Sequence, residues 1–505
     1  MASEKTERPA TGSGGSSASA INVAVLIFTL VSSFLFGSWL NPPPPFTKKD
    51  LLRGLESLAQ VPSLPEDGAS GTHKKHLAIG FNANLDALVA DGPAFLRSLA
   101  GVDEYAKAAD VVTVNTAKEF GQVFAHHFQS ASAGERAIGN DTLWAQIVEH
   151  LDNFEDDEKL GGNAALMAEA VAKGFHDTEV TLMGMSGAKI AGKLSSRVKI
   201  LAGDERTVTI GSQKYPAKHD QIHLILEYPA DSKFGSFKAQ RANRFIVSRD
   251  FANGAIASLE SLSKLRREKV DALVIAGIHI MDGMLPKDIR SQRLQQTKQE
   301  LERFPRTRVH LEMGSTGDAA FSKEIVTSLE FDSLGLNEQE FFTICESFGI
   351  CKAEERASMA SAIPPVIKIQ AAIAGLFEAL PTLSRIHFHC FSYHIVAQRS
   401  SSRGAVWPNP ARAVAAGSVV ATTRACAARV KELHGNKLNL SVSSIKVSDD
   451  AGRTQVVELK PDAPVAVFEF KGIMYNLAPV VSCAVPKQTV GLGDFISAYA
   501  LASQL

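Results

Sequence analysis

Short apolar runs that end in Gly, Asn or Asp recur along most of this 505-residue chain, with helical patterns between them. Runs of this kind, separated by helical stretches of roughly 10 to 20 residues, are typical of βαβ units. The sequence therefore predicts an α/β fold with a central, mostly parallel sheet flanked by helices, in which ligands gather at the carboxyl ends of the strands. The runs are "HLAIGFNANLDALV", "VTLMGMS", "DALVIAGIHIMDG", "TRVHLEMGS", "FDSLGLNEQE" and "SRIHFHCFSYHIV".

Two segments, residues about 90–160 and 215–250, fit this rhythm less well. Within and beside the second segment, "HDQIHLILEYPADSKFG" and "ANRFIVSRD" have the pattern of paired antiparallel strands. We therefore predict a smaller, discontinuous α/β lid inserted into the main domain.

The first 45 residues form a leader of different composition. No charged residue occurs from Pro9 to Thr47, and residues 21–40 are apolar and long enough to cross a bilayer. A buried core helix is the alternative, but Ser/Gly-rich sequence and four prolines isolate the segment. Because no A-x-A-like cleavage site is evident, we favour a retained signal anchor over a cleaved signal, which would release the protein for secretion. Residues 46–505 are expected to form the domain.

Charge and cysteine content exclude several classes of protein. The formal net charge is −1, with 53 basic against 54 acidic residues, so no basic surplus indicates a nucleic-acid partner. Five scattered cysteines are too few for a disulfide-framework protein. One bridge remains possible in an oxidising compartment, and the sequence leaves open whether Cys426 pairs with Cys483.

Two motifs resemble known sites and fail on detail. Gly187 to Lys193 has the spacing of a phosphate-binding P-loop, but Leu194 stands where the motif needs a hydroxyl for Mg²⁺. We interpret it as a glycine turn before an exposed helix. The second motif, "HFHCFSYH", offers zinc-ligand side chains in no standard spacing, and we interpret them as strand-end residues near a ligand pocket. They are His387, His389, Cys390 and His394.

The stretch "TVGLGD" near the C-terminus carries the strongest chemical signal. Gly491 and Gly493 allow successive backbone N–H groups to point outward, and a helix beginning near Phe495 adds its positive end. This arrangement suits a transferring phosphoryl group. Asp494 beside it can accept a proton from an attacking hydroxyl group.

Two further carboxylates follow separate predicted strands. Glu312 ends "VHLE", and Glu340 lies in "GLNEQE". Asn337 and Glu340 also fit a plain helix-capping box. If Glu312, Glu340 and Asp494 face one crevice, their oxygens suit Mg²⁺ beside a phosphate.

Amide, carboxylate and glycine positions follow the first strand and open a later helix. A polyhydroxylated sugar needs such groups, because each hydroxyl both donates and accepts hydrogen bonds. The glycine pair alone also fits a helix-start turn. The residues are Asn82 and Asp86 in "GFNANLD", and Gly161, Gly162 and Asn163 in "LGGNAAL".

Eight motifs in order resemble the eukaryotic ADP-dependent glucokinases, members of the ribokinase-like superfamily. They are "GFNANLD", "GGNAAL", "HLILEYPA", "ANRFI", "HLEMGS", "GLNEQE", "RIHFHCFSYHI" and "TVGLGD". The resemblance runs from about residue 76 to the C-terminus. It implies a ribokinase-like fold, a monomer that binds glucose and ADP with Mg²⁺, and an endoplasmic reticulum location, where residues 21–40 could reach the membrane.

The resemblance also implies roles for matching positions. Asp494 resembles the base that activates the glucose 6-hydroxyl, and Glu312 and Glu340 resemble residues tied to Mg²⁺. Arg244 resembles an arginine that reaches the ADP phosphates from the lid, and Glu135 a lid glutamate associated with glucose over fructose 6-phosphate. Sugar contacts are implied for Asn82, Asp86, Gly161, Gly162 and Asn163.

The implied reaction transfers the β-phosphoryl group of ADP to glucose, giving AMP and glucose 6-phosphate. Two alternatives remain open. One is a ribokinase-like kinase that uses ATP or phosphorylates fructose 6-phosphate. The other is a non-catalytic sugar- or nucleotide-binding membrane protein, which the intact set of carboxylates and glycines disfavours.

Overall fold

A computed structural model covers the chain and divides it into residues 1–47 and a compact unit, residues 48–505. The structure describes residues 46–60, 74–130, 134–151, 153–154, 157–201, 207–210, 212–216, 219–240, 242–400, 404–484, 486–487 and 491–505. The predicted leader, with its apolar segment 21–40, therefore lies outside the described residues. Within the described part, no helix is long and apolar enough to cross a membrane.

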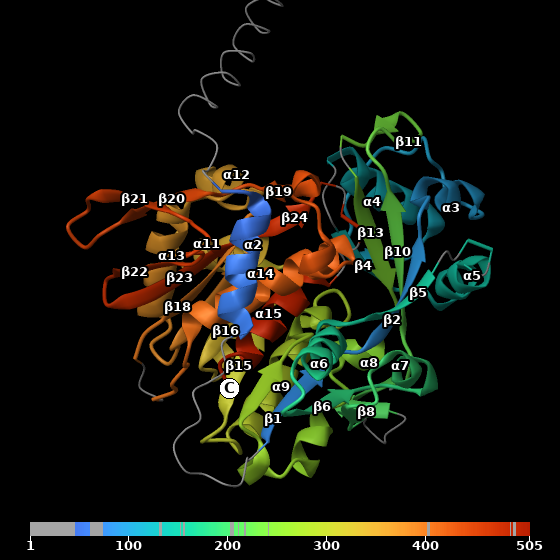
Figure 1. Cartoon of the computed structure of the whole chain (residues 1–505). Helices are drawn as coiled ribbons and strands as arrows, with labels where there is room; N and C mark the ends of the chain where they lie inside the picture. The colour runs from blue at the N-terminus through green and yellow to red at the C-terminus, as the bar shows by residue number, and fades with distance from the viewer. Residues whose placement is uncertain are drawn as a thin grey trace, which may run out of the picture. The chain divides into compact units, whose positions relative to one another are not determined.

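A ten-stranded sheet forms the centre of the unit (Figure 1). Six neighbouring pairs, from β17 to β7, are parallel, and the three pairs at the β22 end are antiparallel, which confirms the mostly parallel sheet. In spatial order the strands are β22 (Ala466–Phe470), β23 (Ile473–Pro479), β18 (Tyr393–Gln398), β17 (Arg385–His389), β16 (Ser333–Asn337), β15 (Arg308–Glu312), β14 (Ala272–Ile275), β1 (Lys75–Phe81), β6 (Thr178–Gly184) and β7 (Val198–Ile200).

A second sheet has six strands and contains both parallel and antiparallel pairs. Its strands β10 and β13 pair antiparallel, as the sequence predicts, with His223 opposite Ser248 and Tyr228 opposite Asn243. Its core is rich in aromatic side chains, with Phe124 packed edge-on against Tyr228 and Phe234. In spatial order the strands are β3 (Thr113–Val114), β4 (Gly134–Ile138), β13 (Asn243–Ser248), β10 (Ile222–Tyr228), β2 (Asn84–Val89) and β5 (Asp157–Gly161). That this sheet moves as a lid stays a prediction.

The first apolar run divides between the two sheets. Residues 75–81 form β1 of the large sheet, whereas residues 84–89 form β2 of the small one, with Asn82 and Ala83 between them. The sequence pattern predicts a continuous opening segment here, because apolar alternation does not reveal where a strand leaves one sheet for another. The polar side chain of Asn82 therefore stands at the point where the chain passes from one sheet to the other.

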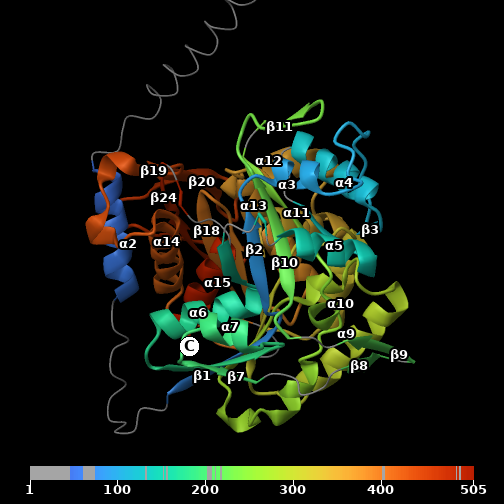
Figure 2. The same cartoon turned by 90° about the vertical axis from the view of Figure 1, so that its right-hand side faces the viewer.

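Helices cover both faces of the large sheet (Figures 1 and 2), with α6, α14 and α15 on one face and α9 and α10 on the other. Alanine-rich α6 packs on α15, so small side chains allow close approach. The helices are α2 (Lys48–Gln60), α3 (Gly92–Ser98), α4 (Ala117–Ser130), α5 (Asp141–Leu151), α6 (Asn163–Gly174), α7 (Ala188–Lys193), α8 (Phe251–Gly254), α9 (Lys287–Leu301), α10 (Ala319–Ser328), α11 (Glu338–Ser347), α12 (Arg356–Met359), α13 (Val366–Ala379), α14 (Pro410–Cys426) and α15 (Leu492–Ala502).

The P-loop-like motif forms a turn at Gly187 followed by α7, whose single buried residue is Ile190. This confirms its interpretation as a glycine turn before an exposed helix. Short hairpins and 3-10 turns complete the unit. They include β8 (Thr207–Ile210) with β9 (Gln213–Pro216), β11 (Lys233–Phe234) with β12 (Phe237–Lys238), β19 (Leu438–Leu440) with β24 (Val481–Cys483), β20 (Ser444–Ser448) with β21 (Thr454–Glu458), and the 3-10 helix η3 (Ile278–Met281).

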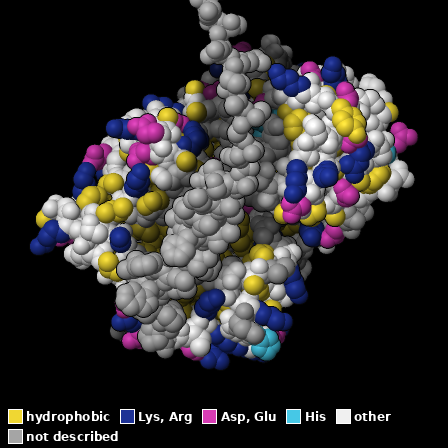
Figure 3. Space-filling model, turned by 90° about the horizontal axis from the view of Figure 1, so that it is seen from above, with side chains coloured by type: hydrophobic (Ala, Val, Ile, Leu, Met, Phe, Trp, Pro, Cys, Tyr) yellow, Lys and Arg dark blue, Asp and Glu magenta, His cyan; other side chains and the backbone are white. Residues whose placement is uncertain are grey.

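Two disulfides occur among the described residues, Cys345–Cys351 and Cys426–Cys483, while Cys390 is a buried thiol. The sequence left the second pair open and did not anticipate the first. On the face seen from above, acidic and basic side chains are interspersed (Figure 3), in keeping with the near-zero net charge.

Candidate active site

Asp494 lies in the first turn of α15, which begins at Leu492 and has Gly491 as its N-cap. The helix thus starts three residues earlier than the sequence pattern predicts, so Asp494 stands inside the turn. Its side chain is 9% exposed, and its Oδ1 accepts a hydrogen bond of 2.8 Å from Nδ2 of Asn163. Burial raises the pKa of Asp494 to about 7, with a further rise from the charge of Glu312 and an opposing effect from Asn163.

Both glycines of the motif are required by the local geometry. Gly491 has a φ of +67°, and a Cβ there would lie 2.5 Å from Cδ1 of Leu166. A Cβ on Gly493 would lie 2.7 Å from Cε1 of His389. The backbone before α15 therefore approaches its neighbours as only glycine allows, and the first N–H groups of the helix have no intrahelical acceptor.

A chain of amides connects Asp494 to the junction between the two sheets. Nδ2 of Asn82 donates to Oδ1 of Asn163 at 3.3 Å, and Oδ1 of Asn82 accepts from the backbone N–H of Ala164 at 3.0 Å. Gly162, with a φ of +85°, is the N-cap of α6 and places Asn163 at its first position. The structure thus brings three predicted sugar-contact residues to the side of Asp494.

The other two predicted sugar-contact residues, Asp86 and Gly161, lie on the neighbouring strands β2 and β5 of the small sheet. Oδ1 of Asp86 accepts from Nδ2 of Asn84 at 2.7 Å, and a Cβ on Gly161 would lie 2.1 Å from that oxygen. Oδ1 of Asn84 is buried and has no hydrogen-bond partner in the described part of the chain. Burial raises the pKa of Asp86 to about 6, offset in part by His223 and Asn84. An acceptor molecule could satisfy these groups.

Glu135 and Arg244, the two predicted lid residues, lie on neighbouring strands β4 and β13. Oε1 of Glu135 is 3.6 Å from Nδ1 of His223, and the charges of Glu135 and Arg244 both affect the pKa of Asp86. Nε of Arg244 is buried without a hydrogen-bond partner among the described residues. Within those residues, no side-chain hydrogen bond or ion pair joins Arg244 to Asp494. Because its charge acts on Asp86, Arg244 lies on the sugar side. Its contact with phosphate stays a prediction.

Glu312 ends β15 and is held by two partners. His310 lies with Nε2 2.9 Å from Oε2, and the hydroxyl of Ser497 in α15 donates to Oε1 at 3.1 Å. Burial alone would raise the pKa of Glu312, but His310 and the nearby His389 more than offset this and lower it to about 2. Glu312 is therefore a fixed negative charge beside Asp494.

Glu340 forms the complete capping box that its spacing allows. Its Oε2 accepts from the backbone N–H of Asn337 at 2.9 Å and its Oε1 from Nδ2 of Asn337 at 2.8 Å. Burial raises the pKa of Glu340 to about 7, and the charge of Glu312 contributes. A cavity of about 310 Å³ opens beside Glu340 and is also lined by Ser315 and Arg356.

The donor set of Glu312, Glu340 and Asp494 consists of oxygens, which fits Mg²⁺. Their like charges raise the pKa of both Glu340 and Asp494, so a cation there would be stabilising. In the described part of the chain, however, these carboxylates are not a group with all ligand atoms within 4.8 Å of one another. This also agrees with Mg²⁺, which commonly keeps waters and phosphate oxygens beside one or two carboxylates.

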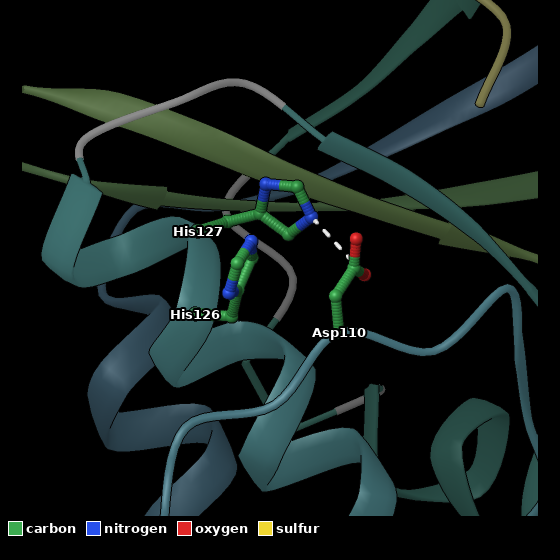
Figure 4. A group of neighbouring side chains, drawn as sticks. All are labelled: Asp110, His126 and His127. Atoms are coloured by element: carbon green, nitrogen blue, oxygen red, sulfur yellow. Dashed lines mark ion pairs between the residues drawn. The ribbon is translucent and has the colours of Figure 1, made fainter.

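A tighter group of possible ligand atoms, all within 4.8 Å of one another, lies elsewhere, at Asp110, His126 and His127 of the small-sheet layer (Figure 4). Both oxygens of Asp110 accept from Arg136 at 2.8 Å, so its charge is already neutralised. Nε2 of His127 is 3.9 Å from Asp110, and its ring stacks on Phe245. We interpret this group as structural.

The histidines of the sequence motif "HFHCFSYH" do not form a zinc site together. Nε2 of His387 is 3.0 Å from Nδ1 of His394, while His389 points to Glu312 at 3.7 Å. His389 is thus a strand-end residue beside the carboxylates, in line with its interpretation from sequence.

Sequence reasoning missed two residues of the site. His223, inside the quoted motif "HLILEYPA", pairs in register with Asp86, and its spacing gives no signal of this contact. Arg424 of α14 lies 3.6 Å over the ring of Phe495, and its charge lowers the pKa of Asp494. No sequence motif marks it.

A buried aspartate at a helix N-terminus, on the carboxyl side of a mostly parallel sheet, is an arrangement that suits a phosphotransferase of α/β fold. Residues 75–503 match the ADP-specific Phosphofructokinase/Glucokinase conserved region. The chain belongs to this family of ADP-dependent sugar kinases, which confirms the resemblance seen in the sequence.

Relatives extend over most of the chain. It is 30% identical to the "Probable ADP-dependent glucokinase" of Caenorhabditis elegans over 448 residues, 85% of each chain. It is 31% identical to the "ADP-dependent glucokinase" of Bos taurus over 442 residues, which cover 85% of this chain and 84% of that one. The structure matches a solved "ADP-dependent kinase complex with fructose-6-phosphate and ADPbetaS" with a TM-score of 0.61 at 17% identity, over 90% of this chain and 97% of that chain. The expected fold class is therefore confirmed.

Proposed function

We propose that the protein transfers the β-phosphoryl group of ADP to the 6-hydroxyl of glucose, giving glucose 6-phosphate and AMP. The observation that carries the proposal is the 2.8 Å hydrogen bond between Asn163 and Asp494, because it joins the sugar-side amides to the phosphate-side helix. The two glucokinase relatives support the choice of donor and acceptor.

Asp494 is the general base. Its carboxylate removes the proton of the 6-hydroxyl as the hydroxyl oxygen attacks the β-phosphorus, and the bond to the bridging oxygen breaks to release AMP. A pKa of about 7 lets Asp494 accept this proton near neutral pH. Asn163 orients the carboxylate.

Gly491 and Gly493 expose the N–H groups at the start of α15 to the transferring phosphoryl group. Arg244 would bind ADP phosphate from the small sheet, since its Nε is free among the described residues. Glu312, Glu340 and Asp494 would hold Mg²⁺, which when bound neutralises phosphate charge. Asn82, Asp86, Gly161 and Gly162 would bind the sugar hydroxyls.

Glucose is favoured over fructose 6-phosphate, the ligand of the solved relative, by the carboxylates of Glu135 and Asp86. The carboxylates of Asp86, Glu135 and Asp250 outnumber the cationic side chains of His223 and Arg244 there, and the net negative charge would repel a sugar phosphate. A Glu135→Gln variant should therefore gain relative activity with fructose 6-phosphate. Unchanged selectivity would remove this argument.

The test is a coupled assay of the full chain with ADP or ATP and with glucose or fructose 6-phosphate. We expect turnover with ADP and glucose, and we expect Asp494→Asn to lower kcat by about 10³-fold or more while ADP still binds. Near wild-type turnover of Asp494→Asn would contradict the mechanism. Equal turnover with ATP would contradict the donor.

We also propose that residues 21–40 direct a monomeric kinase to the endoplasmic reticulum membrane. The support is the uncharged apolar leader and the proline stop that follows it. Deleting residues 1–45 should leave the kinase in the cytosolic fraction, and membrane retention of the truncated chain would overturn the proposal.

A further inference from the structure

Asp250 is a fully buried carboxylate next to the sugar side of the site, and it takes no part in the steps of the proposed reaction. It is 0% exposed and is the N-cap of the short helix α8. Its Oδ1 accepts from the backbone N–H of Asn253 at 2.9 Å, and its Oδ2 is 2.9 Å from Nε2 of His223. One carboxylate thus contacts a helix start and an imidazole from the small sheet.

Asp250 is itself anchored to the junction between the two sheets. The side-chain amide of Asn253 donates to Oδ2 of Asp250 and to the carbonyl oxygen of Ala83, the latter at 3.0 Å. The amide oxygen of Asn253 accepts from the N–H of Ala83 at 3.2 Å. Ala83 lies between two asparagines of the sugar side, so the carboxylate cannot shift without moving that junction.

His223 presents its other nitrogen to the acceptor side. Nδ1 lies 3.6 Å from Oε1 of Glu135, and His223 is opposite Asp86 in the strand register. With Nε2–H donated to Asp250, the ring orientation is fixed and a proton on Nδ1 points toward the carboxylates. The imidazole therefore lies between the carboxylates of Asp250 and Glu135, at 2.9 Å from the first and 3.6 Å from the second.

We propose that Asp250 is a positioning residue for the sugar acceptor, acting through His223, which it fixes in orientation and keeps protonated between Asp86 and Glu135. The proposal rests on the proposed function, since it concerns the acceptor side of that site. Without this positive charge, the buried carboxylate of Asp86 and the exposed carboxylate of Glu135 would face the acceptor uncompensated, which is unfavourable for binding.

Electrostatics agree with the geometry. Burial alone would lower the pKa of His223, but the hydrogen bond with Asp250 and the nearby carboxylates more than offset this and raise it to about 9. His223 is therefore positively charged at neutral pH and loses its proton as pH rises through about 9. The charged or titratable groups around it are Asp86, Glu135, Asp250, Arg244 and His279.

The test uses Asp250→Asn in the full chain, because asparagine keeps the shape and the capping acceptor but removes the charge. We expect KM for glucose to rise about tenfold or more, while KM for ADP stays within about twofold. Asp91→Asn is the matched control, because Asp91 caps α3 in the same way, accepting from Ala94 at 2.9 Å, but is exposed. It should change neither KM.

A double-mutant cycle separates positioning from general damage. In a His223→Gln background, Asp250→Asn should add little to KM for glucose, because the partner through which it acts is gone. Additive losses, or an unchanged KM for glucose in Asp250→Asn, would overturn the proposal.

A pH measurement covers the case in which Asp250→Asn fails to fold. In the wild type, KM for glucose should be flat between about pH 7 and pH 8, above the pKa of about 6 of Asp86, and should rise above about pH 9. His223→Gln should abolish that rise. The same rise in His223→Gln would overturn the proposal. If the wild type phosphorylates fructose 6-phosphate and not glucose, the proposed function fails, and KM for that acceptor then decides the role of Asp250.

Discussion

Asp494 is influenced by two neighbours with opposite effects. The charge of Glu312 raises its pKa, and the hydrogen bond from Asn163 lowers it. A base has to be ionised to accept a proton, so activity should fall as pH drops through its pKa of about 7. The two neighbours therefore set where the acid limb of the rate profile lies.

Asn163→Ala should move the acid limb of kcat/KM to higher pH, because the ionised carboxylate loses its donor. Glu312→Gln should move the limb to lower pH, because a repelling charge is removed. At pH 7 we expect Asn163→Ala to be slower by roughly tenfold or more, as expected for a lost charge-assisted bond. The measurement is kcat/KM from pH 5.5 to 9 at one fixed, subsaturating Mg²⁺ concentration for all variants, because bound Mg²⁺ lowers the pKa of a carboxylate ligand.

Asn82→Ala is the control for this pair. It removes the 3.3 Å contact with Asn163 but leaves the bond to Asp494 in place. It should lower the rate without moving the limb. Shifts of the same sign in Asn163→Ala and Glu312→Gln would show that neither acts through the pKa of Asp494.

At the scale of elements, the start of α15 depends on backbone conformation as well as on space. Gly491 and Gly472 have nearly the same φ, +67° and +68°, but only Gly491 is crowded, because nothing lies within 4 Å of a Cβ on Gly472. Leu166, which such a Cβ on Gly491 would contact, is buried in the main core and has little room to move. The two glycines separate conformational strain from packing.

Gly472→Ala should cost about 1 kcal/mol, the penalty of a left-handed conformation alone. Gly491→Ala should cost about 1–3 kcal/mol more through overpacking, and it should lower kcat at least tenfold because the N–H groups of α15 move. Thermal unfolding and kcat of both variants provide the check. Equal stability losses would mean that Leu166 yields to the added methyl group.

The capping box of α11 links helix stability to the proposed metal. Asn337→Ala should destabilise the protein by about 1 kcal/mol and raise the Mg²⁺ concentration needed for half-maximal velocity, because Glu340 loses the amide that holds Oε1. Asn140→Ala is the matched control, since Asn140 accepts from the N–H of Leu143 at 3.0 Å just before α5, away from the carboxylates. It should lose similar stability with no change in Mg²⁺ requirement. An unchanged requirement in Asn337→Ala would argue against Glu340 as a ligand.

The sequence predicted elements better than contacts between them. Glu312 and Asn337 were placed at strand ends because apolar runs mark parallel strands, and such ends share one edge of a sheet. The contact of His223 with Asp250 was missed, because it joins strand β10 to the N-cap of α8, just beyond the neighbouring strand β13, and spacing carries no information on such a contact. The start of α15 was misplaced because glycines weaken the helical pattern, although here close packing requires them.

At the scale of the whole molecule, two disulfides close loops of very different length. Cys426–Cys483 joins the last residue of α14 to β24 across a separation of 57 residues, whereas Cys345–Cys351 spans 6. A cross-link restricts the unfolded chain more when its loop is longer. The Cys426–Cys483 bridge also lies in a small core, where Cys426 packs with Leu52 of α2.

Replacing both Cys426 and Cys483 by alanine should therefore destabilise the protein by roughly 4 kcal/mol, and replacing Cys345 and Cys351 by roughly 2 kcal/mol. Thermal unfolding of the two double variants is compared with the wild type in oxidising and in reducing buffer. Reduction should bring the wild type toward the stability of a four-alanine variant, which reduction itself should leave unchanged. A larger loss from the Cys345–Cys351 pair would show that local packing at the end of α11, rather than loop closure, governs the contribution of these bridges, because the chain-entropy argument allows only the opposite order.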